Sequence, residues 1–191
     1  MNNGWRTVDI VVTAAIAVAF GVVYWAWGLL YAGIGPLFTF YAPASNVIDG
    51  MWLVAGVLAG LVVRKPGAAL FAEFVAATIE AMLGGQWGLD TLVSGVVQGL
   101  GAEIVFAIAR YRVWTLGIAV LAAAASALGG WLHDVPVFYA ELTVTDWILL
   151  LIIYVVSGAL IAGVGSWWLM RALAQSGVLA QFPSGRLQTR I

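Results

Sequence analysis

Residues 47–83 read VIDGMWLVAGVLAGLVVRKPGAALFAEFVAATIEAML, two apolar runs joined by the short turn RKPG. A helix needs about 20 apolar residues to cross the hydrocarbon core of a bilayer. The runs at 47–63 and 67–83 approach that length, and the basic residues of the stretch, Arg64 and Lys65, both stand in the turn. This pattern predicts a helical hairpin whose turn lies on the cytoplasmic side of a membrane.

The composition of the whole chain is typical of a membrane protein. Of its 191 residues, 63% are hydrophobic and 9% are charged, whereas soluble domains carry about 25% charged residues. Further apolar runs at 8–29, 91–109, 113–132 and 146–170 bring the predicted spans to six. We therefore expect an all-α membrane protein of six transmembrane helices, forming a single integral membrane domain over residues 1–191 with a short cytoplasmic tail.

The basic residues predict the orientation of these helices. With six spans, the loops 30–46, 84–90 and 133–145 share one side of the membrane and contain no Lys or Arg. The basic residues all fall on the other side: Arg6, Arg64, Lys65, Arg110, Arg112, Arg171, Arg186 and Arg190. Because Lys and Arg concentrate in cytoplasmic segments, we expect a multi-pass protein of the plasma membrane with both termini cytoplasmic.

Several classes of function are disfavoured by what the sequence lacks. Cysteine is absent and histidine occurs once, which excludes thiolate chemistry and leaves little for a multi-histidine metal site. We find no basic run for nucleic acid, no phosphate-binding loop, no HExxH and no nucleophile elbow. We expect no metal, no cofactor and no catalysis by this chain, although the pair His133 and Asp134 would fit a catalytic dyad, a metal fragment or simply a polar loop start.

Three glutamates, Glu73, Glu80 and Glu103, lie inside predicted spans, where an ionisable group costs about 2.5–3.5 kcal/mol or more. Glu73 and Glu80 are two helical turns apart and share one stripe. Because the third and fourth spans are antiparallel neighbours, we expect Glu80 near Gln98 and Glu73 near Glu103. No basic residue lies deep in a span. The carboxyl groups therefore either form a hydrogen-bonded structural network or await a ligand that carries an amine or a cation.

Aromatic residues concentrate on the side without basic residues. Some are interpreted as the interfacial belt of a membrane protein, among them Trp27, Phe138 and Trp147. Others stand close in sequence to acids, amides or the histidine, and aromatic walls with a few polar groups are typical of pockets for flat ligands. The candidate substrate-binding residues are Tyr41, Asp49, Trp52, Glu80, Trp87, Gln98, Trp131, His133 and Asp134.

Three segments carry a family resemblance: RKPGAALFAEFVAATIEAMLGG at 64–85, VQGLGAEIVF at 97–106 and SGALIAGVG at 157–165. With them the chain resembles, over nearly its whole length, the substrate-binding S components of energy-coupling factor (ECF) transporters. The resemblance is to the YkoE-type family, associated with thiamine and its hydroxymethylpyrimidine precursor. It implies an S-component-like bundle of six helices with both termini inside.

The resemblance also implies a mechanism. An S component captures a vitamin in a cavity near the outer surface and then docks on a transmembrane coupling protein, the T protein, which carries ATPase subunits. Docking in such proteins uses an alanine motif on the first helix. Ala15 and Ala19 fit that motif here, with Ala14 as a register alternative. We therefore expect the substrate-capture subunit of an ATP-driven importer of thiamine or hydroxymethylpyrimidine.

The glutamates receive different expected roles in this interpretation. Glu80 is the candidate for direct contact with the aminopyrimidine ring, while Glu73 and Glu103 are expected in an intramembrane polar network. The alternative is a stand-alone proton-coupled carrier of small molecules that uses all three glutamates as a relay. Two further hypotheses are a membrane enzyme that uses His133 and Asp134 and a purely structural subunit.

Overall fold

The computed structural model describes residues 4–38 and 40–186, and all regular structure in that part of the chain is helical. Helix α1 (Thr7–Ile34) is followed by the short 3-10 helix η1 (Gly35–Phe38), and the 3-10 segment η2 (Ala42–Leu53) continues directly as α2 (Val54–Val63). The remaining elements are α3 (Ala68–Met82), α4 (Asp90–Ile108), α5 (Leu116–Phe138), α6 (Val144–Ser157), the π-helical segment η3 (Gly158–Val164), α7 (Gly165–Gln175) and α8 (Pro183–Arg186).

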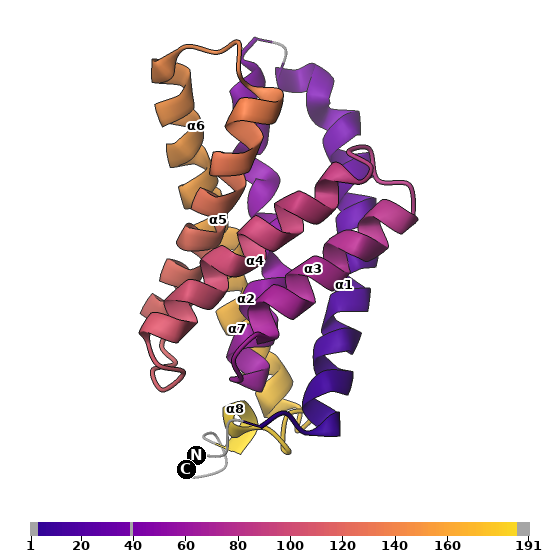
Figure 1. Ribbon diagram of the computed structural model, residues 1–191, viewed down its shortest axis with the longest axis vertical. Helices are drawn as coiled ribbons and strands as arrows, with labels where there is room; N and C mark the ends of the chain where they lie inside the picture. Colours follow the sequence, from indigo (N-terminus) through magenta and orange to yellow (C-terminus); the bar gives the residue numbers. More distant parts are fainter. Residues whose placement is uncertain (1–3, 39, 187–191) are drawn as a thin grey trace.

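These elements form six spans, in agreement with the sequence prediction. Five runs are long and apolar enough to cross a membrane: Thr7–Phe38, Pro43–Val63, Asp90–Ile108, Leu116–Phe138 and Val144–Gln175. The remaining span is α3, whose 15 residues extend only about 22 Å, less than the hydrocarbon thickness of about 30 Å. Figure 1 shows α3 and α4 crossing the bundle obliquely, so that the turn between them ends short of the other loops at that end.

Helix α2 lies at the centre of the bundle. All ten of its residues are buried, and all are Val, Ala, Gly or Leu. It packs against α1, α3, α4 and α7. A helix that is apolar on every side belongs in an apolar surrounding, and here the other helices supply that surrounding. The first half of the hairpin at 47–83 is therefore the core around which the other spans assemble.

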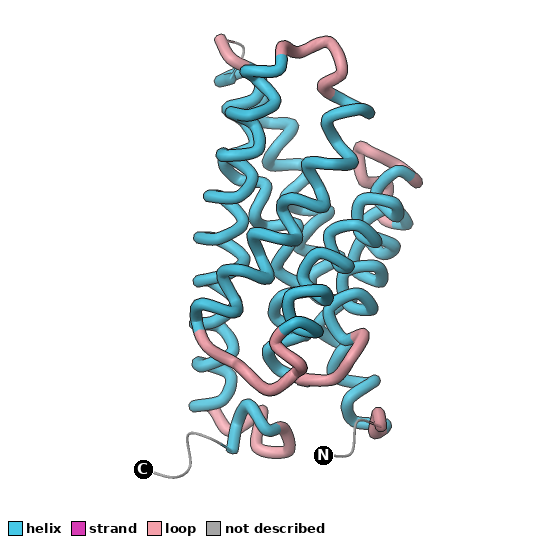
Figure 2. Tube along the Cα trace, turned by 60° about the vertical axis from the view of Figure 1, so that its left-hand side comes forward, coloured by secondary structure: helices cyan, strands magenta, loops and turns pink. Residues whose placement is uncertain are grey.

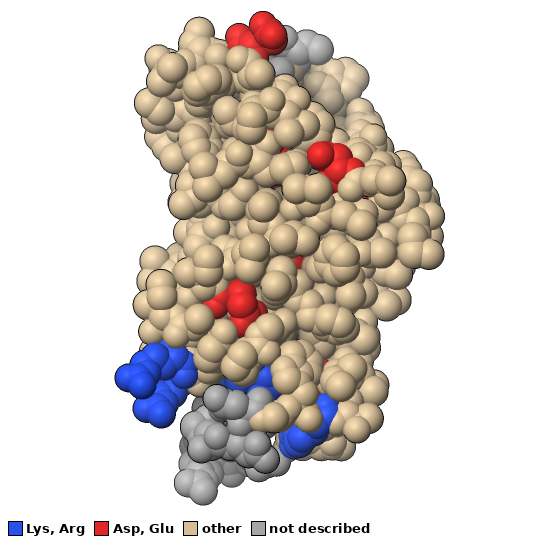
Figure 3. Space-filling model, in the orientation of Figure 1, with Lys and Arg blue, Asp and Glu red and all other residues tan. Residues whose placement is uncertain are grey.

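The two ends of the described chain lie together, as Figure 2 shows. Trp5 Nε1 donates to the carbonyl oxygen of Pro66 (3.0 Å), and Ser184 Oγ donates to that of Val62 (2.9 Å), so both ends contact the α2–α3 region. Figure 3 shows the Lys and Arg side chains of this face gathered at the same end. We call it the basic end, formed by Arg6, Arg64, Lys65, Arg110, Arg112 and Arg171. Arg190, predicted on this side, lies outside the described residues.

Two predicted loops are partly helical. The loop predicted at 30–46 contains the end of α1, all of η1 and the start of η2. The loop predicted at 133–145 begins on α5, so His133 and Asp134 lie on the last turns of a helix rather than in a loop. The apolar run ends at His133, but the helix continues because these polar side chains are hydrogen-bonded within the protein.

The second and sixth spans both depart from α-helical winding where they meet. The N–H of Gly50 in η2 donates to Ser157 Oγ (2.9 Å), and this hydroxyl donates to the carbonyl oxygen of Val47 (2.7 Å). A Cβ atom at Gly50 would overlap the backbone of Ser157. Only glycine therefore permits this approach between η2 and the start of η3. Irregular backbone at membrane depth is tolerated where it is buried in protein or lines a cavity.

We predict that Gly50→Ala destabilises the protein by about 1–3 kcal/mol, because the added methyl group overpacks the η2–η3 contact. This loss should exceed the gain in helix propensity, which favours Ala over Gly by about 1 kcal/mol. Thermal unfolding of the purified protein in detergent measures the effect. Gly33→Ala is the matched control, because a methyl group there meets nothing within 4 Å. Equal melting temperatures for the two variants would contradict the prediction.

Candidate functional site

A cavity of about 190 Å³ lies in the half of the bundle away from the basic end. It is larger than a bound ion or water molecule requires. All six spans contribute to its wall. The wall carries five acids, Asp49, Glu73, Glu80, Asp90 and Asp134, and two amides, Asn46 and Gln98. Within the part of the chain that the structure describes, no Lys or Arg lines it.

The 3-10 winding of η2 determines which of its side chains reach the cavity. Asn46, Asp49 and Trp52 are spaced three residues apart, and all three line the wall. A 3-10 helix has 3.0 residues per turn, so such side chains lie directly above one another. In an α-helix each step of three residues would rotate the side chain by about 60° from the last. The irregular winding therefore aligns an amide, an acid and an indole on one face.

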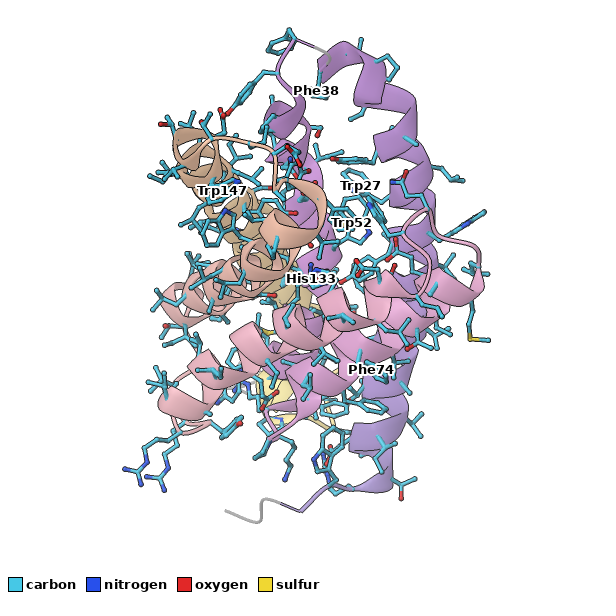
Figure 4. The ribbon with its side chains drawn as sticks, turned by 45° about the horizontal axis from the view of Figure 1, so that its top comes forward. Trp27, Phe38, Trp52, Phe74, His133 and Trp147 are labelled. Carbon is cyan, nitrogen blue, oxygen red and sulfur yellow. The ribbon has the colours of Figure 1, made fainter. Side chains whose placement is uncertain are left out.

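An aromatic cluster forms one side of the cavity. Tyr31, Trp52 and Trp87 contact one another edge to face or tilted, with ring centroids 5.1–5.8 Å apart. The indole N–H of Trp52 donates to Glu80 Oε1 (3.1 Å), which connects this cluster to α3. Figure 4 shows Trp52 and Trp27 between α1 and the second span. The arrangement places a buried carboxyl group beside flat aromatic surfaces.

Glu73 has a different environment, although it lines the same cavity. Its Oε2 accepts the N–H of Gly56 (2.7 Å) and the hydroxyl of Tyr24 (3.3 Å), and the Tyr24 oxygen accepts the N–H of Ala55 (2.8 Å). Both N–H groups belong to the first turn of α2, where an α-helix has no internal acceptors. Glu73 thus caps α2 from the neighbouring helix α3, with Tyr24 of α1 as the third partner.

Glu103 caps another helix at the basic end, so the expected approach of Glu73 to Glu103 does not occur. Its two oxygens accept the N–H groups of Gly67 (2.7 Å) and Ala69 (3.0 Å) at the start of α3. Tyr111 also donates to it (2.6 Å). Burial, together with this hydrogen bond, raises the pKa of the Tyr111 hydroxyl and keeps it protonated as a donor. The carboxyl groups of Glu73 and Glu103 both accept backbone N–H groups. No sequence pattern predicts these donors.

A chain of polar side chains runs from the surface to the far wall of the cavity. His133 Nε2 lies 3.4 Å from Asp90 Oδ1, and its Nδ1 lies 2.8 Å from Asp134 Oδ1. Asp134 also accepts the hydroxyl hydrogen of Tyr154. His133 therefore orients Asp134 without lining the cavity itself. Both side chains are therefore engaged by neighbouring polar groups.

The structure brings together six of the nine predicted substrate-binding residues: Asp49, Trp52, Glu80, Trp87, Gln98 and Asp134. His133 stands behind Asp134, as described above. Tyr41 and Trp131 point elsewhere, because Tyr41 donates to Asp146 (3.0 Å) and Trp131 to the carbonyl oxygen of Trp147 (2.9 Å). Gln98 shares the cavity with Glu80 but donates to Ser94 Oγ (2.9 Å).

Several residues of the wall were not predicted from sequence. They are Tyr24, Tyr31, Asn46, Asp90, Thr91, Ser94, Phe138, Tyr139 and Tyr154. Phe138, interpreted as a belt residue, lines the cavity instead. The spacing of Asn46, three residues before Asp49, is the one signal that could have revealed it. The tyrosines are brought in by helix phase, which the sequence does not fix.

The predicted docking alanines lie on the surface of α1. Ala15 and Ala19 are exposed, and Ala14 is half-buried. Ala17 points the other way and packs against Ala59 and Ala72. Ala15 and Ala19 thus form a strip of small side chains on the surface of α1, whose opposite side packs against the core.

Comparisons with known proteins agree with this architecture. A family model described as "ABC-type cobalt transport system, permease component" matches residues 8–129. The "Putative HMP/thiamine permease protein YkoE" of Bacillus subtilis (strain 168) is 36% identical over 189 residues, covering 96% of this chain and 92% of that protein. The crystal structure of an S-component of an ECF transporter matches with a TM-score of 0.92 and 34% identity, over 98% of this chain and 94% of that one. The chain belongs to the YkoE-type family of ECF-transporter S components.

The family assignment fixes the broad function. This S component is a multi-pass membrane protein and the substrate-binding subunit of an ECF transporter. The family is one of transporter subunits. The cavity at the end opposite the basic end is accordingly the candidate substrate site.

We predict that Glu73→Gln keeps nearly full stability, because its side-chain oxygen can still accept the N–H of Gly56. Glu73→Leu should be less stable by about 1–3 kcal/mol, since it leaves buried donors unsatisfied. Chemical or thermal unfolding in detergent compares the two variants. If the Gln variant were as unstable as the Leu variant, the negative charge of Glu73, rather than its role as a hydrogen-bond acceptor, would be the stabilising feature.

Proposed function

We propose that this S component captures thiamine or its hydroxymethylpyrimidine precursor for an ATP-driven importer. The observation that supports the proposal most directly is the Glu80 carboxyl group, held by the indole N–H of Trp52 beside an aromatic cluster. Both ligands contain the same flat aminopyrimidine ring with an exocyclic amine. The name of the Bacillus subtilis relative refers to the same two compounds.

The chemistry of the wall suits that ring. A carboxylate accepts a hydrogen bond from an exocyclic amine and pairs with a protonated ring nitrogen, and such charge-assisted bonds are the stronger ones. Trp52, Trp87 and Tyr31 provide aromatic surface for an offset or edge contact with the ring. In this proposal Glu80 binds the pyrimidine edge, and Glu73 holds the helix beneath it.

The proposal places the basic end in the cytoplasm and the cavity toward the outside, following the bias of Lys and Arg for cytoplasmic segments. The whole chain then works as one membrane domain. Capture occurs from outside, and energy comes from a T protein with its ATPase subunits. The exposed alanines Ala15 and Ala19 are the proposed docking strip, since small side chains allow two helices to approach closely.

The proton-coupled carrier has less support from the geometry. A relay needs carboxyl groups that exchange protons along a path. Glu103 lies at the basic end, outside the cavity wall, and both of its oxygens accept backbone N–H groups. Glu73 is occupied by Gly56 and Tyr24. Glu73 and Glu103 therefore have structural partners. Of the three glutamates, Glu80 is the one proposed to contact a ligand.

We predict that thiamine and hydroxymethylpyrimidine both quench the tryptophan fluorescence of the purified protein, since Trp52 and Trp87 line the cavity. Glu80→Gln should weaken both ligands by roughly tenfold or more, the scale of one charge-assisted hydrogen bond. Glu141→Gln is the control, because Glu141 is exposed and outside the cavity wall. Absence of saturable binding of either ligand to the unmodified protein would overturn the proposed function. Unchanged affinities in Glu80→Gln would move the ring to another part of the wall.

We also predict that Ala15→Trp combined with Ala19→Trp abolishes uptake in vesicles that contain the T protein and ATPase subunits, because bulky side chains keep the partner helix away. Ligand binding in detergent should stay unchanged. Ala32→Trp, an exposed position near the other end of α1, is the matched control. Normal uptake by the double variant would exclude this strip as the docking surface.

A further inference from the structure

Asp49 is the carboxyl group of the cavity that the protein leaves incomplete. Its side chain lines the wall and is only 9% exposed. Its Oδ1 is buried without a hydrogen-bond partner among the described residues. Thr91 Oγ1, on the same wall, is also buried without a partner. Buried polar atoms in native proteins nearly always have partners, and in the wall of a cavity a bound molecule can supply the missing one.

The position of Asp49 is fixed rather than adaptable. It lies between Asn46 and Trp52 on the aligned face of η2, and the next residue, Gly50, is hydrogen-bonded to Ser157. Because a side chain at position 50 would overlap the backbone of η3, the segment cannot shift toward that span. The carboxyl group is therefore held toward the cavity by the backbone of two spans.

Three donors on this wall already have acceptors. The Tyr154 hydroxyl lies within reach of Asp49 and Asp134, but it donates its single hydrogen to Asp134. The indole of Trp52 donates to Glu80. The amide of Asn46 donates to the carbonyl oxygen of Pro43 (3.0 Å). No Lys or Arg of the described residues lines the wall to balance the charge. Asp49 Oδ1 is therefore open to a group that a ligand brings into the cavity, either a hydrogen-bond donor or a cation.

The cavity thus has two acidic regions of different character. Glu80 lies in the aromatic cluster with α3, whereas Asp49 lies on η2 with Asp134 and Tyr154 close by. A ligand with a hydrogen-bond donor at one end and a cationic group at the other would suit both regions. A positively charged end favours the ionised form of the Asp49 carboxyl group and pairs with it, whereas a neutral hydroxyl gives no charge pairing.

We propose that Asp49 is a second ligand anchor, which binds a cationic group and selects cationic over neutral ligands that share the same pyrimidine ring. The proposal rests on the proposed function, because it takes the pyrimidine at Glu80 as the common part. Thiamine carries a thiazolium cation beyond that ring, whereas hydroxymethylpyrimidine carries a neutral hydroxyl. Asp49 then sets the preference between them, and Glu80 binds what they have in common.

The test is Asp49→Asn, titrated with thiamine and separately with hydroxymethylpyrimidine. The substitution keeps the shape of the side chain and removes the charge. We expect thiamine binding to weaken by about tenfold to a hundredfold, as for loss of a charge-assisted contact, and hydroxymethylpyrimidine binding to change by less than about threefold. Glu141→Gln removes one exposed negative charge away from the cavity and should change neither affinity.

A second measurement uses the unmodified protein and does not depend on how the variant folds. The probe is the aminomethyl analogue of hydroxymethylpyrimidine, in which an ammonium group replaces the hydroxyl on the same ring. We expect it to bind at least about tenfold tighter than hydroxymethylpyrimidine. Equal binding of these two compounds, or equal weakening of thiamine and hydroxymethylpyrimidine by Asp49→Asn, would overturn the role of Asp49 while leaving the proposed function intact. Failure of the unmodified protein to bind any of the three compounds would overturn both.

Discussion

Backbone N–H groups at the start of a helix need acceptors, and inside a membrane no water supplies them. Two intramembrane glutamates meet this requirement. Glu73 accepts from the first turn of α2, and Glu103 accepts from the first turn of α3. Each acid lies on the span that follows the helix it caps. The hairpin at 47–83 is thereby held in place by carboxyl groups that a lipid-facing helix could not carry.

The same constraint explains how the cavity exists. The second span starts as a 3-10 helix and becomes α-helical at Val54, and the donors that Glu73 and Tyr24 satisfy belong to the turn after this change. The 3-10 part aligns Asn46, Asp49 and Trp52 along the cavity. One irregularity therefore accounts for the polar face along the cavity and for the backbone N–H groups that require a cap.

Much of the fold can be predicted from the apolar runs and the charged residues of the sequence. The six spans and the shared side of the basic residues follow from hydrophobicity and from the placement of Lys and Arg. The acids and indoles of the site could also be found, because Glu80, Trp52 and Trp87 are conspicuous near the ends of apolar segments. Apolarity does not, however, determine winding or rotational phase.

The residues that sequence reasoning misplaced show this limit. Glu73 and Glu103 have similar expected depths, yet equal depth does not imply contact, because each faces a different helix start. Tyr41 is close in sequence to the cavity face of η2 but bonds to Asp146 on α6. From the sequence Phe138 is interpreted as a belt residue, but α5 continues past His133 and places Phe138 on the cavity wall. In each case a hydrogen bond or a helix end, rather than composition, decides the direction of the side chain.

The acids of this protein differ in how completely neighbouring groups satisfy them, and this difference underlies the structural and binding roles proposed for them. Glu73 and Glu103 accept backbone N–H groups and can be exchanged only for other acceptors. Glu80 accepts one indole N–H, and Asp49 retains a buried oxygen without a donor. An unsatisfied polar atom is costly in a low-dielectric interior, so Glu80 and Asp49 are the acids whose surroundings favour a further partner. The proposed ligand, with its amine and its positive charge, would supply to Glu80 and Asp49 what the protein itself does not.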